Sequence, residues 1–232
     1  ASSNSNGSIT SSVSANTTAG FSIVTYTGSG SAGSTYGHGL DSAPEIIITK
    51  GRETAYNWTV YHSGIAADAE TDYLRLDGTA AATDASNVWN DTAPTSSVIT
   101  VGNFGRVNAV NQDYVSYCFH SVEGYSRVGS YRGNGNANGM FVNTGFRPAW
   151  VLIKSTSSGT QWMLYDNKRE GYNVDNDALT ADDTATEKTD DDIDFLSNGF
   201  KLRRSSTNFN NSSHTYIYLA FAEAPFKFAN AR

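Results

Sequence analysis

The side chains that could bind a metal ion gather in an acidic segment between Asp175 and Asp194. Carboxylate oxygens are the ligands that calcium prefers, and Asp190, Asp192 and Asp194 are the calcium candidates. The spacing of an EF-hand loop is absent from the segment. We therefore favour a solvated acidic loop over a metal site, and we predict that the protein carries no cofactor.

Nucleophilic chemistry has little support in the sequence. The histidines lie far apart, without the spacing of metal ligands or of a catalytic triad: His38, His62, His120 and His214. The only cysteine, Cys118, aligns with Ala220 and is typical of a small residue packed in a strand. No GxSxG, Walker or strand-to-helix GxGxxG motif is present.

Acid–base chemistry of the glycosidase type needs two carboxyl groups at a defined separation, which a sequence does not give. The residues that could supply such a pair are Asp72, Asp77, Glu123 and Glu170. Because similar pairs occur by chance in any β protein of this size, we predict that the protein is not an enzyme.

Aromatic residues beside polar residues in expected loops point to sugar binding. Such rings stack on sugars while their polar neighbours bind the hydroxyl groups. The ligand-site candidates are Trp89, Asn90, Asp91, Tyr125, Arg127 and Tyr172. The alternative, that these rings pack locally beneath loops, stays open.

The elements that would position these residues are predicted to be strands. The chain contains 13 Tyr, 11 Phe and 4 Trp among 21 Gly, and it is poor in the usual helix formers. Apolar residues alternate along two segments, 113–119 and 215–221, as they do in half-buried strands. The sequence therefore predicts an all-β fold, with at most a short helical turn within 167–193.

The two halves of the chain align from end to end, which predicts an internal duplication. IVTYTGSG aligns with VGSYRGNG, NWTVYH with QWMLYD, and DYVSYCFHSVEG with TYIYLAFAEAPF. These matches pair Tyr26 with Tyr131, and the intervening strands pair Lys50 with Lys154.

The duplication sets the predicted domain organisation. Residues 1–20 form a Ser/Asn/Thr-rich linker or strand arm, 21–124 and 125–226 are tandem pseudo-repeats, and 227–232 form a C-terminal tail. We expect each repeat to be an antiparallel β-sandwich lobe of jelly-roll or Greek-key type, with a lectin-like fold. Whether the repeats form separate lobes or one sandwich stays open.

Charge and hydropathy exclude two classes of partner. A net charge of −7 repels phosphate backbones and anionic lipids. No apolar run approaches the length of about 20 residues that crosses a bilayer, and no signal peptide opens the chain. We predict neither a nucleic-acid partner nor membrane insertion, and we expect the chain to start at a boundary inside a longer protein.

Four stretches of the chain resemble an uncharacterised domain that is common in tail proteins of marine bacteriophages. They are GFSIVTYTGSGSAGSTYGHGLDSAPEIIITK, VWNDTAPTSSVITVG, YVSYCFHSVEGYSRVGSYRGNG and TGFRPAWVLIK, within residues 8–226. The resemblance implies a virion tail or tail-fibre component, located on the outside of the particle. The order of the strands is also similar to that of small trimeric sandwich modules with lectin-like roles, a likeness of fold only.

These observations lead to three hypotheses of function. The first is a non-enzymatic module that attaches the virion to a host-surface glycan or other receptor. The second is a purely structural fibre or decoration protein, and the third is a polysaccharide depolymerase. We further expect a homo-oligomer, most simply a trimer, in contact with other tail proteins.

Overall fold

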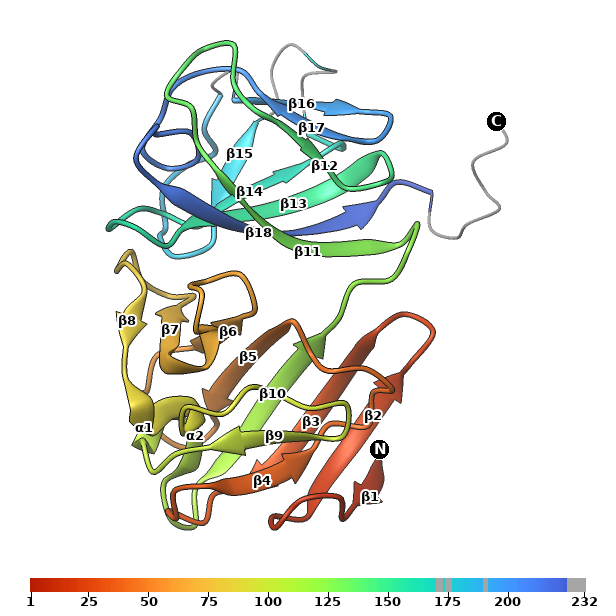
Figure 1. The fold of residues 1–232 in the computed structure, drawn as a ribbon, viewed down its shortest axis with the longest axis vertical. Helices are drawn as coiled ribbons and strands as arrows, with labels where there is room; N and C mark the ends of the chain where they lie inside the picture. Colours follow the sequence, from red (N-terminus) through yellow and green to blue (C-terminus); the bar gives the residue numbers. More distant parts are fainter. Residues whose placement is uncertain (170–172, 174–176, 190–191, 225–232) are drawn as a thin grey trace. The chain divides into compact units, whose positions relative to one another are not determined.

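The computed structural model describes residues 1–169, 173, 177–189 and 192–224 and contains two compact units (Figure 1). The first unit comprises Ala1–Leu76 and Ala82–His120, and the second comprises Asp77–Ala81 and Ser121–Arg232. The chain changes unit close to the predicted boundary between residues 124 and 125. The segment Asp77–Ala81, which the sequence placed inside the first repeat, packs with the second unit.

The first unit is built on an eight-stranded sheet and a two-stranded sheet. The order of the larger sheet is β1 (Ser2–Asn4), β2 (Ser11–Asn16), β3 (Phe21–Thr27), β10 (Asp113–Phe119), β5 (Ile46–Gly51), β6 (Thr59–His62), β7 (Asp72–Arg75) and β8 (Thr83–Asp84). The smaller sheet pairs β4 (Ser34–Gly37) with β9 (Val98–Val101). The predicted N-terminal arm is therefore a pair of strands, β1 and β2, added to the edge of β3.

Alternation of side chains explains how the larger sheet of the first unit buries one face. Along β3 and β10, every second residue is buried, so that Tyr26 and Tyr114 point into the core. Their rings stack with centroids 5.2 Å apart, and Tyr26 also stacks on Tyr36 of the smaller sheet at 4.1 Å. The opposite face of these strands remains partly exposed.

The second unit consists of a five-stranded and a three-stranded sheet (Figure 1). The first has the order β11 (Ser126–Arg132), β18 (Thr215–Ala222), β13 (Pro148–Ser155), β14 (Met163–Asp166) and β15 (Ala178–Thr180). The second has the order β12 (Phe141–Asn143), β17 (Gly199–Leu202) and β16 (Ile193–Leu196). One buried cluster takes side chains from both sheets, among them Phe200 and Tyr218, whose rings meet edge to face at 5.5 Å. This is the core of a β-sandwich.

The predicted all-β class is confirmed. The described residues contain only three short helical elements, η1 (Ala69–Thr71), α1 (Ser86–Trp89) and α2 (Gly105–Asn108). All three lie outside 167–193, where the sequence predicted at most a helical turn; the described part of that range contributes β15 and the start of β16. No helix in the described residues is long and apolar enough to span a bilayer.

Tyrosine contacts at aligned positions recur in the two units. Tyr26 pairs with Tyr114 in the register of β3 and β10, and Tyr131 pairs with Tyr216 in that of β11 and β18. The Tyr26 hydroxyl donates to the Val107 carbonyl at 2.7 Å, and the Tyr131 hydroxyl donates to the carbonyl of Phe209 at 2.8 Å. An internal duplication would produce matched contacts of this kind, and the duplication itself stays a prediction.

Two aligned glycines allow a close approach of the backbone in each unit. A Cβ atom at Gly28 would lie 2.2 Å from the Ala109 carbonyl oxygen, and one at Gly133 would lie 2.3 Å from that of Asn211. Any other residue at either position would collide with backbone atoms, which explains the glycine in both aligned turns.

Candidate functional site

Trp89 does not offer its ring to a ligand. The side chain is only 2% exposed, and its indole nitrogen donates to the Asp72 carbonyl at 3.1 Å. The ring also meets Tyr61 edge to face at 5.8 Å. The prediction of a sugar-stacking role for Trp89 is therefore wrong, because the short helix α1 turns the ring into the core.

The polar neighbours of Trp89 form a turn. Asn90 and Asp91 both have left-handed backbone conformations, with φ of 56° and 45°, and Asn90 ends α1. The Thr92 hydroxyl donates to the Asn90 carbonyl at 2.7 Å. Asn and Asp tolerate this conformation better than most residues, so a structural role accounts for both.

The remaining ligand candidates belong to the second unit. Tyr125 lies edge-on to Phe221 at 5.9 Å and is partly buried. Arg127 is exposed on β11. Tyr172 lies outside the described residues. The candidates are thus divided between two units, and the structure does not gather them within either one.

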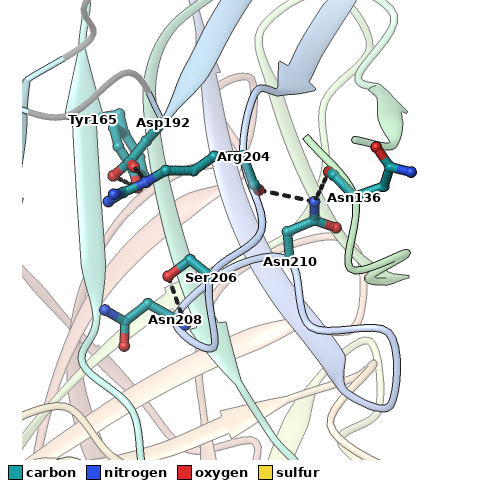
Figure 2. A network of polar contacts seen from close by, with 7 residues as sticks. All are labelled: Asn136, Tyr165, Asp192, Arg204, Ser206, Asn208 and Asn210. Atoms are coloured by element: carbon teal, nitrogen blue, oxygen red, sulfur yellow. Dashed lines mark hydrogen bonds and ion pairs between the residues drawn. The ribbon is translucent and has the colours of Figure 1, made fainter. Parts of the chain in front are cut away.

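Two of the three calcium candidates form ion pairs with arginines. Asp192 is fully buried, accepting a hydrogen bond from Arg204 Nε at 2.6 Å and from the Tyr165 hydroxyl at 2.9 Å (Figure 2). Asp194 lies 3.3 Å from Arg203 Nε. Burial and the nearby carboxylate of Asp192 raise the pKa of Tyr165 well above its ordinary value.

This arginine pairing differs from a calcium site, where the carboxylates face the cation. Asp190 lies outside the described residues. Within the described part of the chain, no three His, Cys, Asp or Glu side chains are placed to hold a metal ion.

A buried asparagine in each unit joins loops that the sequence did not connect. Asn210 Nδ2 donates to the carbonyls of Asn136 and Arg204 at 2.8 and 2.9 Å (Figure 2). The Asn210 Oδ1 atom accepts from the Asn134 amide. Asn108 Nδ2 donates likewise to Ser31 and Gly102 at 3.0 and 2.7 Å. Sequence reasoning missed both, although each precedes an aligned tyrosine, Tyr114 or Tyr216, by the same number of residues.

Two histidines occupy different environments. His38 is buried, with Nε2 3.1 Å from the Thr95 carbonyl and Nδ1 accepting from the Leu40 amide. Burial lowers the pKa of His38. His214 Nδ1 lies within hydrogen-bond distance of three hydroxyl groups, those of Ser155, Ser158 and Tyr216. These contacts bring no carboxylate to the imidazole and so do not form a triad.

Lys154 is a fully buried amine in the second unit. Its Nζ donates to the Thr79 carbonyl at 3.1 Å and lies 3.2 Å from the Thr160 hydroxyl. The Thr160 amide donates to the same carbonyl at 2.9 Å. Burial lowers the pKa of Lys154 to about 8, although Asp182 opposes the shift. The amine therefore fastens the segment Asp77–Ala81 to its unit.

The described surface is hollowed at one end of the larger sheet of the first unit. This groove has a volume of about 390 Å³ and takes residues from β1, β2, β3 and β10, together with Thr10 directly before β2 and Arg52 directly after β5. Its lining is Ser3, Thr10, Ser11, Ser12, Thr25, Tyr26, Thr27, Arg52, Asp113 and Tyr114. Such a surface, rich in hydroxyl groups, suits a polar ligand with many hydroxyl groups of its own.

Strand register explains which groove residues face outward. Ser12 pairs with Thr25, and Thr27 pairs with Asp113 on the next strand. The Arg52 amide donates to the Asp113 carbonyl at 2.8 Å, which places Arg52 beside that pair. We name the outward set the hydroxyl face, and its members are Ser3, Thr10, Ser12, Thr25, Thr27, Arg52 and Asp113.

The hydroxyl face contains one positively charged hydrogen-bond donor, Arg52, and one negatively charged hydrogen-bond acceptor, Asp113. Asp113 Oδ1 accepts a hydrogen bond from the Thr27 hydroxyl at 2.7 Å. Arg52 is exposed and forms no ion pair with any described residue. Asp113 is the only carboxylate in the groove lining. The face can therefore donate and accept hydrogen bonds at neighbouring points but lacks the carboxyl pair of a glycosidase.

Comparison with known proteins gives a family without a described activity. No curated protein matches the chain. No solved structure matches it either. A family described as a domain of unknown function, DUF7483, matches residues 1–225. The chain therefore belongs to the DUF7483 family of domains of unknown function.

Proposed function

We propose that this domain is a non-catalytic attachment module of a bacteriophage tail or tail fibre, and that it binds a host-surface glycan through the hydroxyl face. The observation that supports this function is the groove of about 390 Å³ with its array of hydroxyl groups. The link to a phage tail rests on the sequence resemblance. The virion, outside the host cell, is the corresponding location.

Hydrogen-bonding chemistry favours a sugar at this face. A sugar hydroxyl both donates and accepts, so a guanidinium and a carboxylate side by side can serve two neighbouring hydroxyls. Arg52, directly after β5, and Asp113, the first residue of β10, supply this combination, and the Arg52 amide donates to the Asp113 carbonyl. The serine and threonine hydroxyls around them can rotate to donate or accept.

A glycan array, probed with the intact chain and with Arg52→Ala and Asp113→Asn, tests the proposal. Loss of a hydrogen bond to a charged group should weaken binding by about tenfold to a hundredfold in each variant. Arg127→Ala is the comparison variant, because it removes another exposed arginine, itself a predicted ligand candidate, from a strand outside the groove.

Binding that survives Arg52→Ala and Asp113→Asn but is lost in Arg127→Ala would move the ligand site to β11. If no glycan binds and virions carrying the groove variants adsorb normally, the purely structural hypothesis is favoured. Release of new reducing ends from a polysaccharide would instead favour the depolymerase hypothesis.

We also propose that the domain assembles as a homo-oligomer, most simply a trimer. The likeness of the strand order to that of small trimeric sandwich modules supports this proposal, whereas exposed aromatic rings add little to it, because most rings of the described residues are buried. The large apolar side chains exposed in the described residues are Ile23, Tyr56, Val110, Met140 and Phe141. Light scattering at micromolar concentration distinguishes a trimer from a monomer, and a monomer would contradict the proposal.

A further inference from the structure

The outward surface next to the groove continues along the same strands and changes in character. Beyond Thr25 on β3 lies Ile23, and beyond Asp113 on β10 lie Val115 and then Tyr117. Register pairs Thr25 with Val115 and Ile23 with Tyr117. Paired residues point to the same face of a sheet, so these side chains lie in line with the hydroxyl face.

This continuation is partly exposed and apolar. Ile23 is 37% exposed, and Val115 and Tyr117 are partly exposed. The Tyr117 ring also stacks on Trp58 at a centroid distance of 6.2 Å, which holds it in place. We name Ile23, Val115 and Tyr117 the apolar strip. An aromatic ring fixed beside polar groups is suited to pack against the apolar side of a sugar ring.

We propose that the hydroxyl face and the apolar strip together form one linear platform that binds an extended, uncharged polysaccharide chain along β3 and β10. This inference rests on the proposed glycan-binding function and specifies its ligand. From the Thr27–Asp113 pair to the Ile23–Tyr117 pair the platform runs four residues, or about 13 Å at the rise of a strand. That span is longer than a single sugar ring.

The charges of the platform and of the chain favour an uncharged ligand. Arg52 and Asp113 at one end have opposite charges, and the ammonium group of Lys50, beside Val115 in the register, donates to the Tyr56 carbonyl. The chain as a whole has a net charge of −7, which repels a polyanion. An uncharged polymer escapes that repulsion and still meets the donors and acceptors of the hydroxyl face.

The chain-length dependence of binding tests the platform. The probes are uncharged β-1,4-linked manno- and gluco-oligosaccharides from the monosaccharide to the hexasaccharide, together with oligogalacturonates as charged counterparts. Affinity for an uncharged series, measured by calorimetry with the intact chain, should rise from the monosaccharide to the trisaccharide or tetrasaccharide and then level off. Equal affinity for all lengths, or preference for the charged series, would overturn the inference.

Variants at the two ends separate this inference from the proposed function. Tyr117→Ala should weaken binding of the longer oligosaccharides by about tenfold and leave the monosaccharide unaffected. Ile23→Ser should act in the same direction with a smaller effect. Tyr131→Phe, which removes the hydroxyl of a β11 tyrosine outside the platform, is the control for altering a tyrosine and should leave binding unchanged.

The pattern of losses identifies which claim fails. If Arg52→Ala abolishes binding but Tyr117→Ala has no effect at any length, a glycan site exists without the platform. If neither variant affects binding, or no oligosaccharide or host glycan binds, the proposed function fails as well. Circular dichroism of each variant verifies that it is folded.

Discussion

The two units share the same central order of strands. They differ in whether the strand at the outer edge of that order, β3 or β11, is covered by a further strand. In the first, β3 is covered along its length by β2, which also provides one wall of the groove. In the second, among the described residues, β11 ends the sheet and only its start is covered, where Val122 bridges Ser126 and the Ser121 hydroxyl accepts from the Val128 amide. The added hairpin of β1 and β2 is thus what gives the first unit its candidate site.

The comparison also distinguishes the buried polar residues that both units share from those that occur in one unit. Both units anchor their loops with a buried asparagine, Asn108 or Asn210. Only the second, within the described residues, adds a buried carboxylate–arginine pair, Asp192 with Arg204. The same central order of strands therefore accommodates polar groups that differ between the two units.

The largest expected effect comes from removing the shared anchors. Asn108→Ala and Asn210→Ala each break several buried hydrogen bonds and should lower the free energy of unfolding of their own unit by about 4 kcal/mol. Hydrogen exchange, read separately for each unit, measures the loss. The exposed Asn198→Ala is the control and should change stability by less than about 0.5 kcal/mol. A large loss of stability in only one unit would show that Asn108 and Asn210 do not play the same role.

The second largest effect is expected from removing Arg204, the arginine that pairs with the buried Asp192 in the second unit. Arg204→Ala leaves the buried Asp192 carboxylate with the Tyr165 hydroxyl but without its cation, and should destabilise that unit by about 3 kcal/mol. Arg203→Ala is the matched control, because the ion pair with Asp194 is more exposed and should contribute less than about 1 kcal/mol. Denaturant unfolding compares the two, and equal effects would contradict the importance of burial.

The aligned lysines provide a test by pH. Since burial lowers the pKa of Lys154 to about 8, the folded unit releases this proton before the unfolded chain does, and stability should rise with pH above 8. Relative to Lys154→Met, the native protein should gain about 1.5 kcal/mol between pH 8 and 9.5. Lys50→Met, at a partly exposed site, is the control. If the native protein gained the same stability relative to Lys50→Met, the effect would not come from the burial of Lys154.

The smallest effect concerns the edge of β11. Ser121→Ala removes the hydroxyl that accepts from the Val128 amide and should cost about 1 kcal/mol. Faster hydrogen exchange at Val128, without change at the β2-covered edge of β3, is the expected result. Unaltered exchange at Val128 would mean that something other than Ser121 protects this edge.

The local pattern of the sequence was enough to predict the strands. Alternation along 113–119 and 215–221 identified β10 and β18, although β18 is buried on both faces and not half-buried as predicted. The alignment matched Tyr26 with Tyr131, and the structure then showed their strand partners, Tyr114 and Tyr216. Side-chain alternation is a property of a few neighbouring residues, so it can be read without knowing the strand partners. The acidic segment was harder, because its arginine partners follow it by several residues and only the fold pairs them.

What the sequence determined by itself was the class of fold, the matched turns and the absence of known catalytic motifs. The tertiary structure alone decided that Trp89 is buried, that Asn108 and Asn210 anchor loops, and that the hydroxyl face exists. That face joins Ser12, Thr25 and Asp113 from three strands with Arg52, which directly follows β5, and β10 follows β3 by most of a repeat. Hydrogen bonds between strands distant in sequence bring these residues together, and a local pattern carries no information about such partners.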